Sequence, residues 1–165
     1  PLYFICMKSL SLIQIFQRKH DSMDTKQIVI SHNEEETNEI GRKIGSLLTA
    51  GSVVSLVGVL GSGKTILAKG IAQVLGVQET LVSPTFTLIQ EYMGRLPLYH
   101  MDLYRIEGYD DFIAIGGEEY IYGEGVTLIE WGERILSYLP PETIVISLEL
   151  QDVHTRKLSI SGVTI

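Results

Sequence analysis

Residues 58–65 read Gly58-Val59-Leu60-Gly61-Ser62-Gly63-Lys64-Thr65 and match the pattern G-x-x-x-x-G-K-S/T. An apolar run over residues 52–57 precedes this stretch, as a buried strand would, and a helical pattern follows it to about Leu75. In such an arrangement glycines let backbone N–H groups turn toward phosphate oxygens, and the helix N-terminus adds a positive dipole. The stretch therefore predicts a phosphate-binding loop, with Lys64 directed at the β- and γ-phosphates of a nucleotide and Thr65 at Mg²⁺.

The composition is that of one globular domain with a core. The 165 residues carry a formal net charge of −7, with 45% hydrophobic and 20% charged residues. A chain this acidic, with no run of basic residues, is a poor autonomous binder of nucleic acid, so we expect a partner to hold any RNA. Cys6 is the single cysteine, which excludes an internal disulfide. These features fit a cytoplasmic protein.

Residues 1–22 differ from the rest of the chain, and we expect them to lie outside a single domain over residues 23–165. Their apolar runs, residues 2–5 and 10–16, are far shorter than the roughly 20 residues that span a bilayer. No basic segment precedes these runs and no small-residue cleavage site follows them, which argues against a signal peptide. We expect a chain without this extension to fold and to bind nucleotide.

The patterning predicts a three-layer α/β fold of the P-loop NTPase type. Its central sheet is expected to be mixed and mostly parallel, with antiparallel strands in the C-terminal half. Strands are expected over residues 26–30, 52–57, 85–92, 96–103, 126–131, 143–150 and 156–160.

Helices are expected around these strands. The first is capped by Ser31 or Asn33, and its apolar face is formed by Ile40, Ile44, Leu47 and Leu48. The second covers residues 65–75, and a short third helix covers residues 110–115, broken by Gly116-Gly117. A helical turn is expected before residue 139.

Hydrolysis of a nucleotide needs carboxylates and a segment that senses the γ-phosphate. Asp102 and Glu130 each end an apolar strand, and ligands lie at the carboxyl ends of strands in such sheets. The run Ser83-Pro84-Thr85-Phe86-Thr87 is rich in hydroxyls and fixed by proline, as a loop closing over phosphate would be. Each also has a structural interpretation as a turn residue, a cap or an ordinary loop. His100 is expected to be a structural histidine.

These stretches together resemble the bacterial TsaE (YjeE) ATPases, over about residues 28–160. The combination of His-x-Asp-Leu-Tyr-Arg with Ser-Pro-Thr-Phe/Tyr-Thr is very specific for that family. The matching runs, in the family's order and spacing, are Glu34-Glu35-Glu36-Thr37, residues 58–65, Ser83-Pro84-Thr85-Phe86-Thr87, Tyr99-His100-Met101-Asp102-Leu103-Tyr104-Arg105 and Glu130-Trp131-Gly132-Glu133-Arg134.

The family acts in forming N6-threonylcarbamoyladenosine at position 37 of tRNAs that read codons beginning with A. The resemblance implies that the protein binds ATP and Mg²⁺ and hydrolyses ATP slowly. It also implies that the protein acts on a complex of the TsaD and TsaB proteins. Contact with tRNA would then be indirect, through this complex, and no membrane would be involved.

The resemblance also implies roles for single residues. Asp102 matches the acidic residue that assists hydrolysis, together with Lys64, and Thr65 and Glu130 match positions associated with Mg²⁺. The matched nucleotide-binding positions are Thr37, Gly61, Ser62, Gly63, Lys64, Thr65, Ile66 and Trp131.

Other functions are compatible with a phosphate loop. A GTPase would need an Asn-Lys-x-Asp run, which the sequence lacks. A small-molecule kinase usually brings an arginine-rich lid, whereas the arginines after residue 40 are scattered: Arg42, Arg95, Arg105, Arg134 and Arg156. Arg105 is the nearest candidate for an arginine finger. A nucleotide-gated adaptor, for which ATP binding matters more than turnover, stays open.

The loop departs from the usual sequence of the family at two positions that matter for affinity. Val59 stands where Asp or Asn is usual, and Ile66 stands where Thr or Ser could reach the α-phosphate. We predict that the double variant Val59→Asp, Ile66→Thr binds ATP more tightly than the wild type. Calorimetric titration of ATP into both proteins measures this, and equal affinities would contradict it.

Overall fold

A mixed sheet of seven strands forms the centre of the computed structural model, which describes residues 26–165. The extension predicted at residues 1–22 lies outside the described residues. In the sheet the strand order is β1-β7-β6-β2-β5-β4-β3. The strands are β1 (Gln27–Ser31), β2 (Val53–Val57), β3 (Ile89–Tyr92), β4 (Leu98–Asp102), β5 (Val126–Glu130), β6 (Ile144–Leu150) and β7 (Arg156–Ser161). The helices are α2 (Glu34–Leu47), α3 (Lys64–Val74), α4 (Tyr109–Ala114) and α5 (Gly117–Ile121), with 3-10 turns η1 (Gly132–Arg134) and η2 (Leu136–Tyr138).

The middle of the sheet is parallel and its flanks are antiparallel. Strands β6, β2, β5 and β4 pair in parallel, whereas β3 and β7 run the other way, and β1, antiparallel to β7, again runs with the parallel strands. Every residue of β5 and nearly every residue of β2 is buried, as expected for strands covered on both faces. The predicted mixed, mostly parallel sheet with antiparallel strands in the C-terminal half is confirmed.

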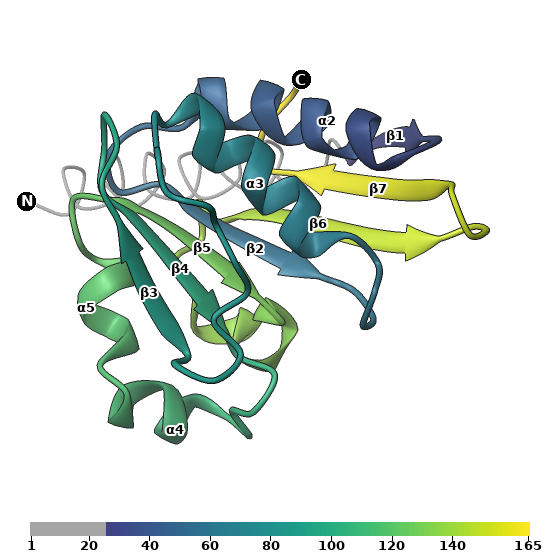
Figure 1. The fold of residues 1–165 in the computed structure, drawn as a ribbon. Coiled ribbons are helices and arrows are strands. Elements are labelled where there is room, and N and C mark those ends of the chain that lie inside the picture. Colours follow the sequence, from purple (N-terminus) through teal and green to yellow (C-terminus); the bar gives the residue numbers. More distant parts are fainter. Residues whose placement is uncertain (1–25) are drawn as a thin grey trace, which may run out of the picture.

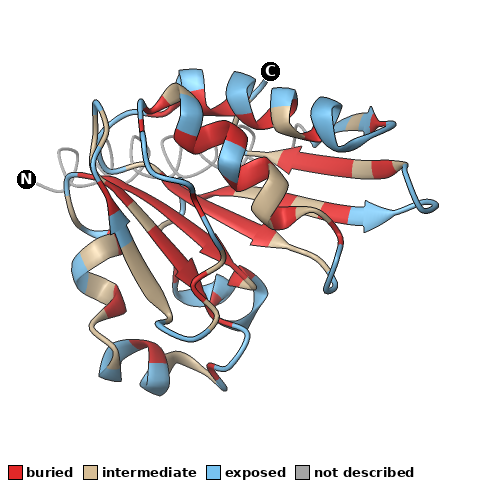
Figure 2. Ribbon diagram, viewed as in Figure 1, coloured by how far each residue is buried: buried red, intermediate tan, exposed pale blue. Residues whose placement is uncertain are grey.

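Helices cover both faces of the sheet, so the molecule has the three predicted layers (Figure 1). Helices α2 and α3 pack on one face over a core that includes Ile44, Leu67 and Leu128. Helices α4 and α5 pack near the other face over a second core that includes Met101 and Phe112. Figure 2 shows the buried residues concentrated along the central strands and on the inward sides of the helices. Within residues 26–165, no helix is long and apolar enough to cross a bilayer.

Helix α2 begins at Asn33, one of the two predicted caps. The Asn33 side chain accepts a hydrogen bond from the backbone N–H of Glu36 at 2.8 Å, and the Glu36 carboxylate accepts one from the N–H of His32 at 2.8 Å. This reciprocal arrangement satisfies two donors at the helix start. The predicted apolar face was wrong at Leu47, which is half exposed. The buried side of α2 is centred on Thr37, Gly41 and Gly45 and their apolar neighbours, and Leu47 lies at the edge of this buried side.

Two other predicted boundaries differ from the structure. The strand expected over residues 85–92 begins only at Ile89, because residues 85–88 form a turn. The Leu88 N–H donates to the Pro84 carbonyl at 2.7 Å, and Leu88 has a φ of 65°. Gly116 ends α4 as predicted, with a φ of 75°, but Gly117 then opens α5, a helix that the sequence reading missed.

Glycines let α2 and α3 approach until their backbones touch. A methyl group at Gly41 would collide with the carbonyl oxygen of Leu67, and one at Gly70 with the carbonyl oxygen of Asn38. At Gly45 it would lie 3.0 Å from the backbone of Ile71. Because the obstacles are backbone atoms, a side chain at these positions forces the helices apart.

We therefore predict that Gly41→Ala destabilises the fold by about 1–3 kcal/mol, as overpacking does. In an exposed helix, alanine is more favourable than glycine by up to about 1 kcal/mol, so the substitution would stabilise the fold if the helices were not in contact. A loss of stability therefore indicates that the added methyl group collides with α3. Chemical denaturation measures it. Gly108→Ala is the control, because Gly108 has extended backbone and no neighbouring atom within 4 Å of the added methyl group. A Gly41→Ala protein as stable as the wild type would contradict the prediction.

Candidate functional site

A cavity of about 490 Å³ opens where the parallel strands end, beside the loop between β2 and α3. This is the edge of an α/β sheet at which ligands bind. The lining residues come from the loop and the start of α3, from the segment after α3, from α2, from the ends of β4 and β5 with the residues that follow, and from the start of β7. They are Glu34, Leu60, Gly61, Gly63, Lys64, Thr65, Ile66, Ser83, Thr85, Asp102, Tyr104, Glu130, Trp131 and Arg156.

The loop has the backbone geometry of an anion cradle. Gly61 and Gly63 have φ angles of 78° and 103°, which residues with side chains rarely adopt. Within the described part of the chain, no hydrogen-bond acceptor is found for the N–H groups of these two glycines. Free donors beside a helix N-terminus suit a phosphate group.

Lys64 is buried inside the loop. Its Nζ donates to the carbonyl oxygens of Gly58 at 2.7 Å and Val59 at 3.0 Å, and it lies 4.1 Å from the centre of the Trp131 ring. Burial lowers the pKa of Lys64, although the nearby carboxylates of Glu130, Glu133 and Asp102 oppose this shift. A phosphate entering the cavity would offer the ammonium group an anionic partner in place of two neutral carbonyls.

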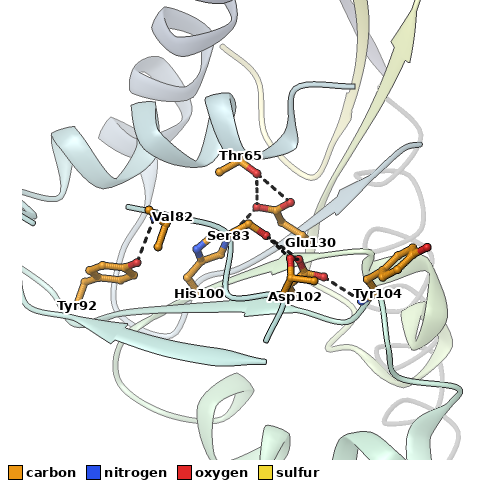
Figure 3. A network of polar contacts seen from close by, with 9 residues as sticks. Thr65, Val82, Ser83, Tyr92, His100, Asp102, Tyr104 and Glu130 are labelled. Carbon is orange, nitrogen blue, oxygen red and sulfur yellow. Dashed lines mark hydrogen bonds and ion pairs between the residues drawn. The ribbon is translucent and has the colours of Figure 1, made fainter. Parts of the chain in front are cut away.

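Thr65 and Glu130 both line the cavity and contact each other (Figure 3). The Thr65 hydroxyl donates to the two carboxylate oxygens of Glu130, at 2.9 and 3.2 Å. Thr65 is the second residue of α3 and Glu130 ends β5, so this contact joins the helix after the loop to the neighbouring strand. A hydroxyl and a carboxylate placed together are hard oxygen ligands of the kind that Mg²⁺ prefers.

His100 supports this pair. It is fully buried on β4, and its Nε2 lies 3.0 Å from the Glu130 carboxylate; its Nδ1 has no partner within residues 26–165. The histidine is structural, as expected, but it orients a residue of the site, which the sequence reading missed. The available signal was a polar side chain between Leu98 and Asp102 on the same face of an apolar strand.

Asp102 is held by the loop after α3. Its Oδ2 accepts hydrogen bonds from the hydroxyls of Ser83 at 2.6 Å and Thr85 at 2.7 Å, and its Oδ1 accepts from the Tyr104 N–H at 2.9 Å (Figure 3). The hydroxyl-rich segment singled out in the sequence therefore contacts the carboxylate singled out at the end of β4. The structure brings both to the cavity that holds Glu130 and Lys64.

The remaining matched positions divide into two groups. Ile66 and Trp131 line the cavity. Trp131 has a left-handed backbone with a φ of 62°, and the centre of its ring lies 5.1 Å from the centre of the Tyr104 ring. Thr37 and Ser62 are fully buried and do not line it. The Thr37 hydroxyl is used internally, by the Ser31 hydroxyl at 2.6 Å and the Asn33 carbonyl at 3.0 Å. Arg105 is absent from the lining, whereas Glu34 and Arg156 are present without having been expected there.

The residues of the cavity fit a nucleotide with its metal ion. Within residues 26–165, no group of three or more His, Cys, Asp and Glu side chains could hold a metal ion by itself. Thr65 and Glu130 supply two oxygen ligands, and an Mg²⁺ ion that is bound by one or two protein groups commonly takes the rest from phosphates and water. The free glycine N–H groups supply the matching phosphate site.

Comparisons with known proteins show which family the chain belongs to. The family model for the threonylcarbamoyl adenosine biosynthesis protein TsaE matches residues 31–158. A tRNA threonylcarbamoyladenosine biosynthesis protein TsaE from Treponema pallidum is 48% identical over 132 residues, covering 80% of this chain and 98% of the relative. Its counterpart from Bacillus subtilis is 42% identical, covering 79% of this chain and 82% of the relative.

A solved structure extends the likeness to three dimensions. The crystal structure of Bacillus subtilis YdiB superposes with a TM-score of 0.70 at 35% identity, covering 84% of this chain and 87% of the other. The match of the family model spans more than half of the sequence and includes the loop, the residues around Asp102 and Glu130. The resemblance seen in the sequence is confirmed: the chain belongs to the TsaE family of threonylcarbamoyl adenosine biosynthesis proteins.

Proposed function

We propose that this protein binds ATP with Mg²⁺ and hydrolyses it slowly, in the cytoplasm, as one step of N6-threonylcarbamoyladenosine formation on tRNA. In this proposal it acts on a complex of TsaD and TsaB and meets tRNA only through that complex. The role in this biosynthesis rests on the family, whose members with 36–48% identity carry the name tRNA threonylcarbamoyladenosine biosynthesis protein. The net charge of −7 supports indirect contact with tRNA.

One observation carries the nucleotide part of the proposal, the 2.9 Å hydrogen bond between Thr65 and Glu130. It joins the loop hydroxyl to a strand-end carboxylate inside a cavity that also holds Lys64. When bound, Mg²⁺ would neutralise charge on the β- and γ-phosphate oxygens, with Thr65 and Glu130 as its protein ligands. A simple glycine turn between a strand and a helix would need no such partner.

In the mechanism that we favour, water attacks the γ-phosphorus in line and ADP leaves. The glycine N–H groups and Lys64 hold the phosphates and stabilise the developing charge. Asp102 orients the attacking water or accepts its proton. Because Asp102 already accepts hydrogen bonds from Ser83 and Thr85, its carboxylate is a weaker base and has less room for a water until the loop releases it. Turnover of the protein alone is then slow, and a partner that moves the loop would accelerate it.

The hydrogen bonds of Ser83 and Thr85 to Asp102 also favour a second function, that of a nucleotide-gated adaptor. If Asp102 serves chiefly to anchor residues 83–85, then ATP binding would move the loop and change the surface offered to a partner without any need for turnover. The small-molecule kinase of the sequence analysis gains no such support, because Arg156 is the one arginine that lines the cavity among the described residues.

We predict that Asp102→Asn lowers ATP turnover by about 100-fold or more, as loss of a general base does, with ATP binding retained. Lys64→Ala is expected to weaken binding itself. ATP turnover and tRNA modification are to be measured together, with purified TsaD, TsaB and tRNA, and turnover of the wild type should rise when the partners are added. If the Asp102→Asn protein supports modification at the wild-type level, the adaptor function replaces hydrolysis as the proposal.

We also predict that Glu130→Gln raises the Mg²⁺ concentration needed for half-maximal turnover by roughly tenfold or more. The amide keeps the shape of the side chain and one oxygen, but removes the charge that would hold the cation. Titration of MgCl₂ at saturating ATP measures the effect. Glu133→Gln is the matched control, because Glu133 lies next to the site without lining the cavity. Equal Mg²⁺ requirements in the Glu130 and Glu133 variants would contradict the assigned metal ligand.

A further inference from the structure

Arg156 reaches the cavity because β7 runs against the parallel strands of the sheet. Strand β7 is antiparallel to β6 and begins at the edge where the parallel strands end. Strand β1 is antiparallel to β7, with Ser31 opposite Arg156, so α2 starts at the same edge and brings Glu34 there. Figure 1 shows the end of β2, the connection between β6 and β7 and the start of α2 on the same side of the sheet. An arginine near the end of the sequence thus lies beside the phosphate loop.

The guanidinium group of Arg156 is buried with little to balance its charge. The side chain is only 6% exposed, and its Nη1 donates to the His154 carbonyl at 2.8 Å. Its Nη2 lies 4.0 Å from the carboxylate of Glu34, which is itself 75% exposed, and its Nε has no partner within residues 26–165. Buried charges are normally paired and hydrogen-bonded, because desolvation is otherwise costly. This guanidinium is therefore short of an anionic acceptor on the side of the cavity.

Arg156 packs directly on the phosphate loop. A Cβ added to Gly63 would lie 2.9 Å from the Arg156 Nε and 3.3 Å from its Cδ. Gly63 immediately precedes Lys64, and its N–H is one of the loop donors for which no acceptor is found within residues 26–165. The guanidinium and the cradle are thus neighbours, and no other arginine lines the cavity in the described part of the chain.

The sheet places Arg156 and Asp102 at opposite ends of the cavity. Strand β7 lies two places from β2 on one side, and β4 lies two places from β2 on the other. Adjacent strands are about 4.8 Å apart, so each end is roughly 10 Å from the strand that leads into the loop. In the proposed function, Asp102 and the loop with Ser83 and Thr85 lie at the end of the cavity where the γ-phosphate reacts. The Arg156 end is therefore that of the α-phosphate and the nucleoside.

We propose that Arg156 is a nucleotide-binding residue that pairs with the α-phosphate of the bound nucleotide. This inference rests on the proposed ATP binding and adds to it a residue and an orientation. ATP and ADP share the α-phosphate, so Arg156 stabilises both complexes to the same extent. Interactions of this uniform kind change binding and leave the rate of the chemical step unaltered. Glu34 is the weak partner of Arg156 when the cavity is free of nucleotide, and its charge opposes the incoming phosphate.

The test compares Arg156→Gln with Lys157→Gln by calorimetric titration of ATP and of ADP. Lys157 is the matched control: it follows Arg156 in β7, carries the same charge and pairs at 3.2 Å with Glu149 away from the cavity. We expect Arg156→Gln to weaken both ATP and ADP binding by at least about tenfold, the loss of one charge-assisted hydrogen bond, with kcat at saturating ATP unchanged. Lys157→Gln should bind both nucleotides as the wild type does.

Two results would overturn the inference: wild-type affinities for both nucleotides in Arg156→Gln, or a fall in kcat with affinity retained, which would place the guanidinium at the γ-phosphate. Circular dichroism and thermal melting check that the variant is folded. If it is not, Glu34→Gln decides the question, since the proposal requires it to bind ATP and ADP several-fold more tightly, and unchanged or weaker binding overturns it.

A further control separates this inference from the function on which it rests. If wild-type protein binds no ATP, the proposed function itself fails. If the wild type binds ATP, Lys64→Ala does not, and Arg156→Gln binds as the wild type does, then only the role of Arg156 is wrong.

Discussion

The parallel pairing of β2, β5 and β4 is the constraint on which the site depends. Because these strands run in one direction, each ends at the same edge, and the register sets Asp102 opposite Glu130 and Leu56 beside it on the other flank. Parallel strands of this kind need cover on both faces, which α2 and α3 provide on one side and the segment containing α4 and α5 on the other. The same cover removes the strand ends from water, so the polar groups there must find partners within the protein.

Two buried carboxylates lie side by side as a result, and each has its own set of donors. Asp102 and Glu130 are both 3% exposed, and two unpaired negative charges in such a place would be costly. Glu130 is contacted by the Thr65 hydroxyl and by His100, whereas Asp102 is contacted by Ser83, Thr85 and the Tyr104 N–H. One carboxylate is thus tied to the helix that carries the phosphate loop, and the other to a loop held chiefly by hydroxyls.

This division separates a part of the site that is tied to packed helices from a part that is tied by side-chain hydrogen bonds. Helix α3, which carries Thr65, is in close backbone contact with α2 at Gly41 and Gly70. The segment around Ser83 and Thr85 has no strand or helix of its own and depends on Asp102 for its anchor. In the proposed function, a γ-phosphate beside Asp102 would lie next to this segment, as both the hydrolytic and the adaptor functions require.

The sequence by itself determined the features that depend on neighbours a few residues apart. The glycine-rich loop between a strand and a helix, a helix cap at Ser31 or Asn33, the buried strands β2 and β5 and the strand-end carboxylates were all visible, because turn chemistry, capping and apolar runs are local. The same reasoning extended the strand at Ile89 too far, since the turn before it is held by Asp102, a residue outside the segment. Only the tertiary structure decided that His100 supports Glu130 and that Arg156 and Glu34 reach the cavity. Those positions follow from which strands pair and in which direction, and such long-range pairing is not encoded in any local pattern.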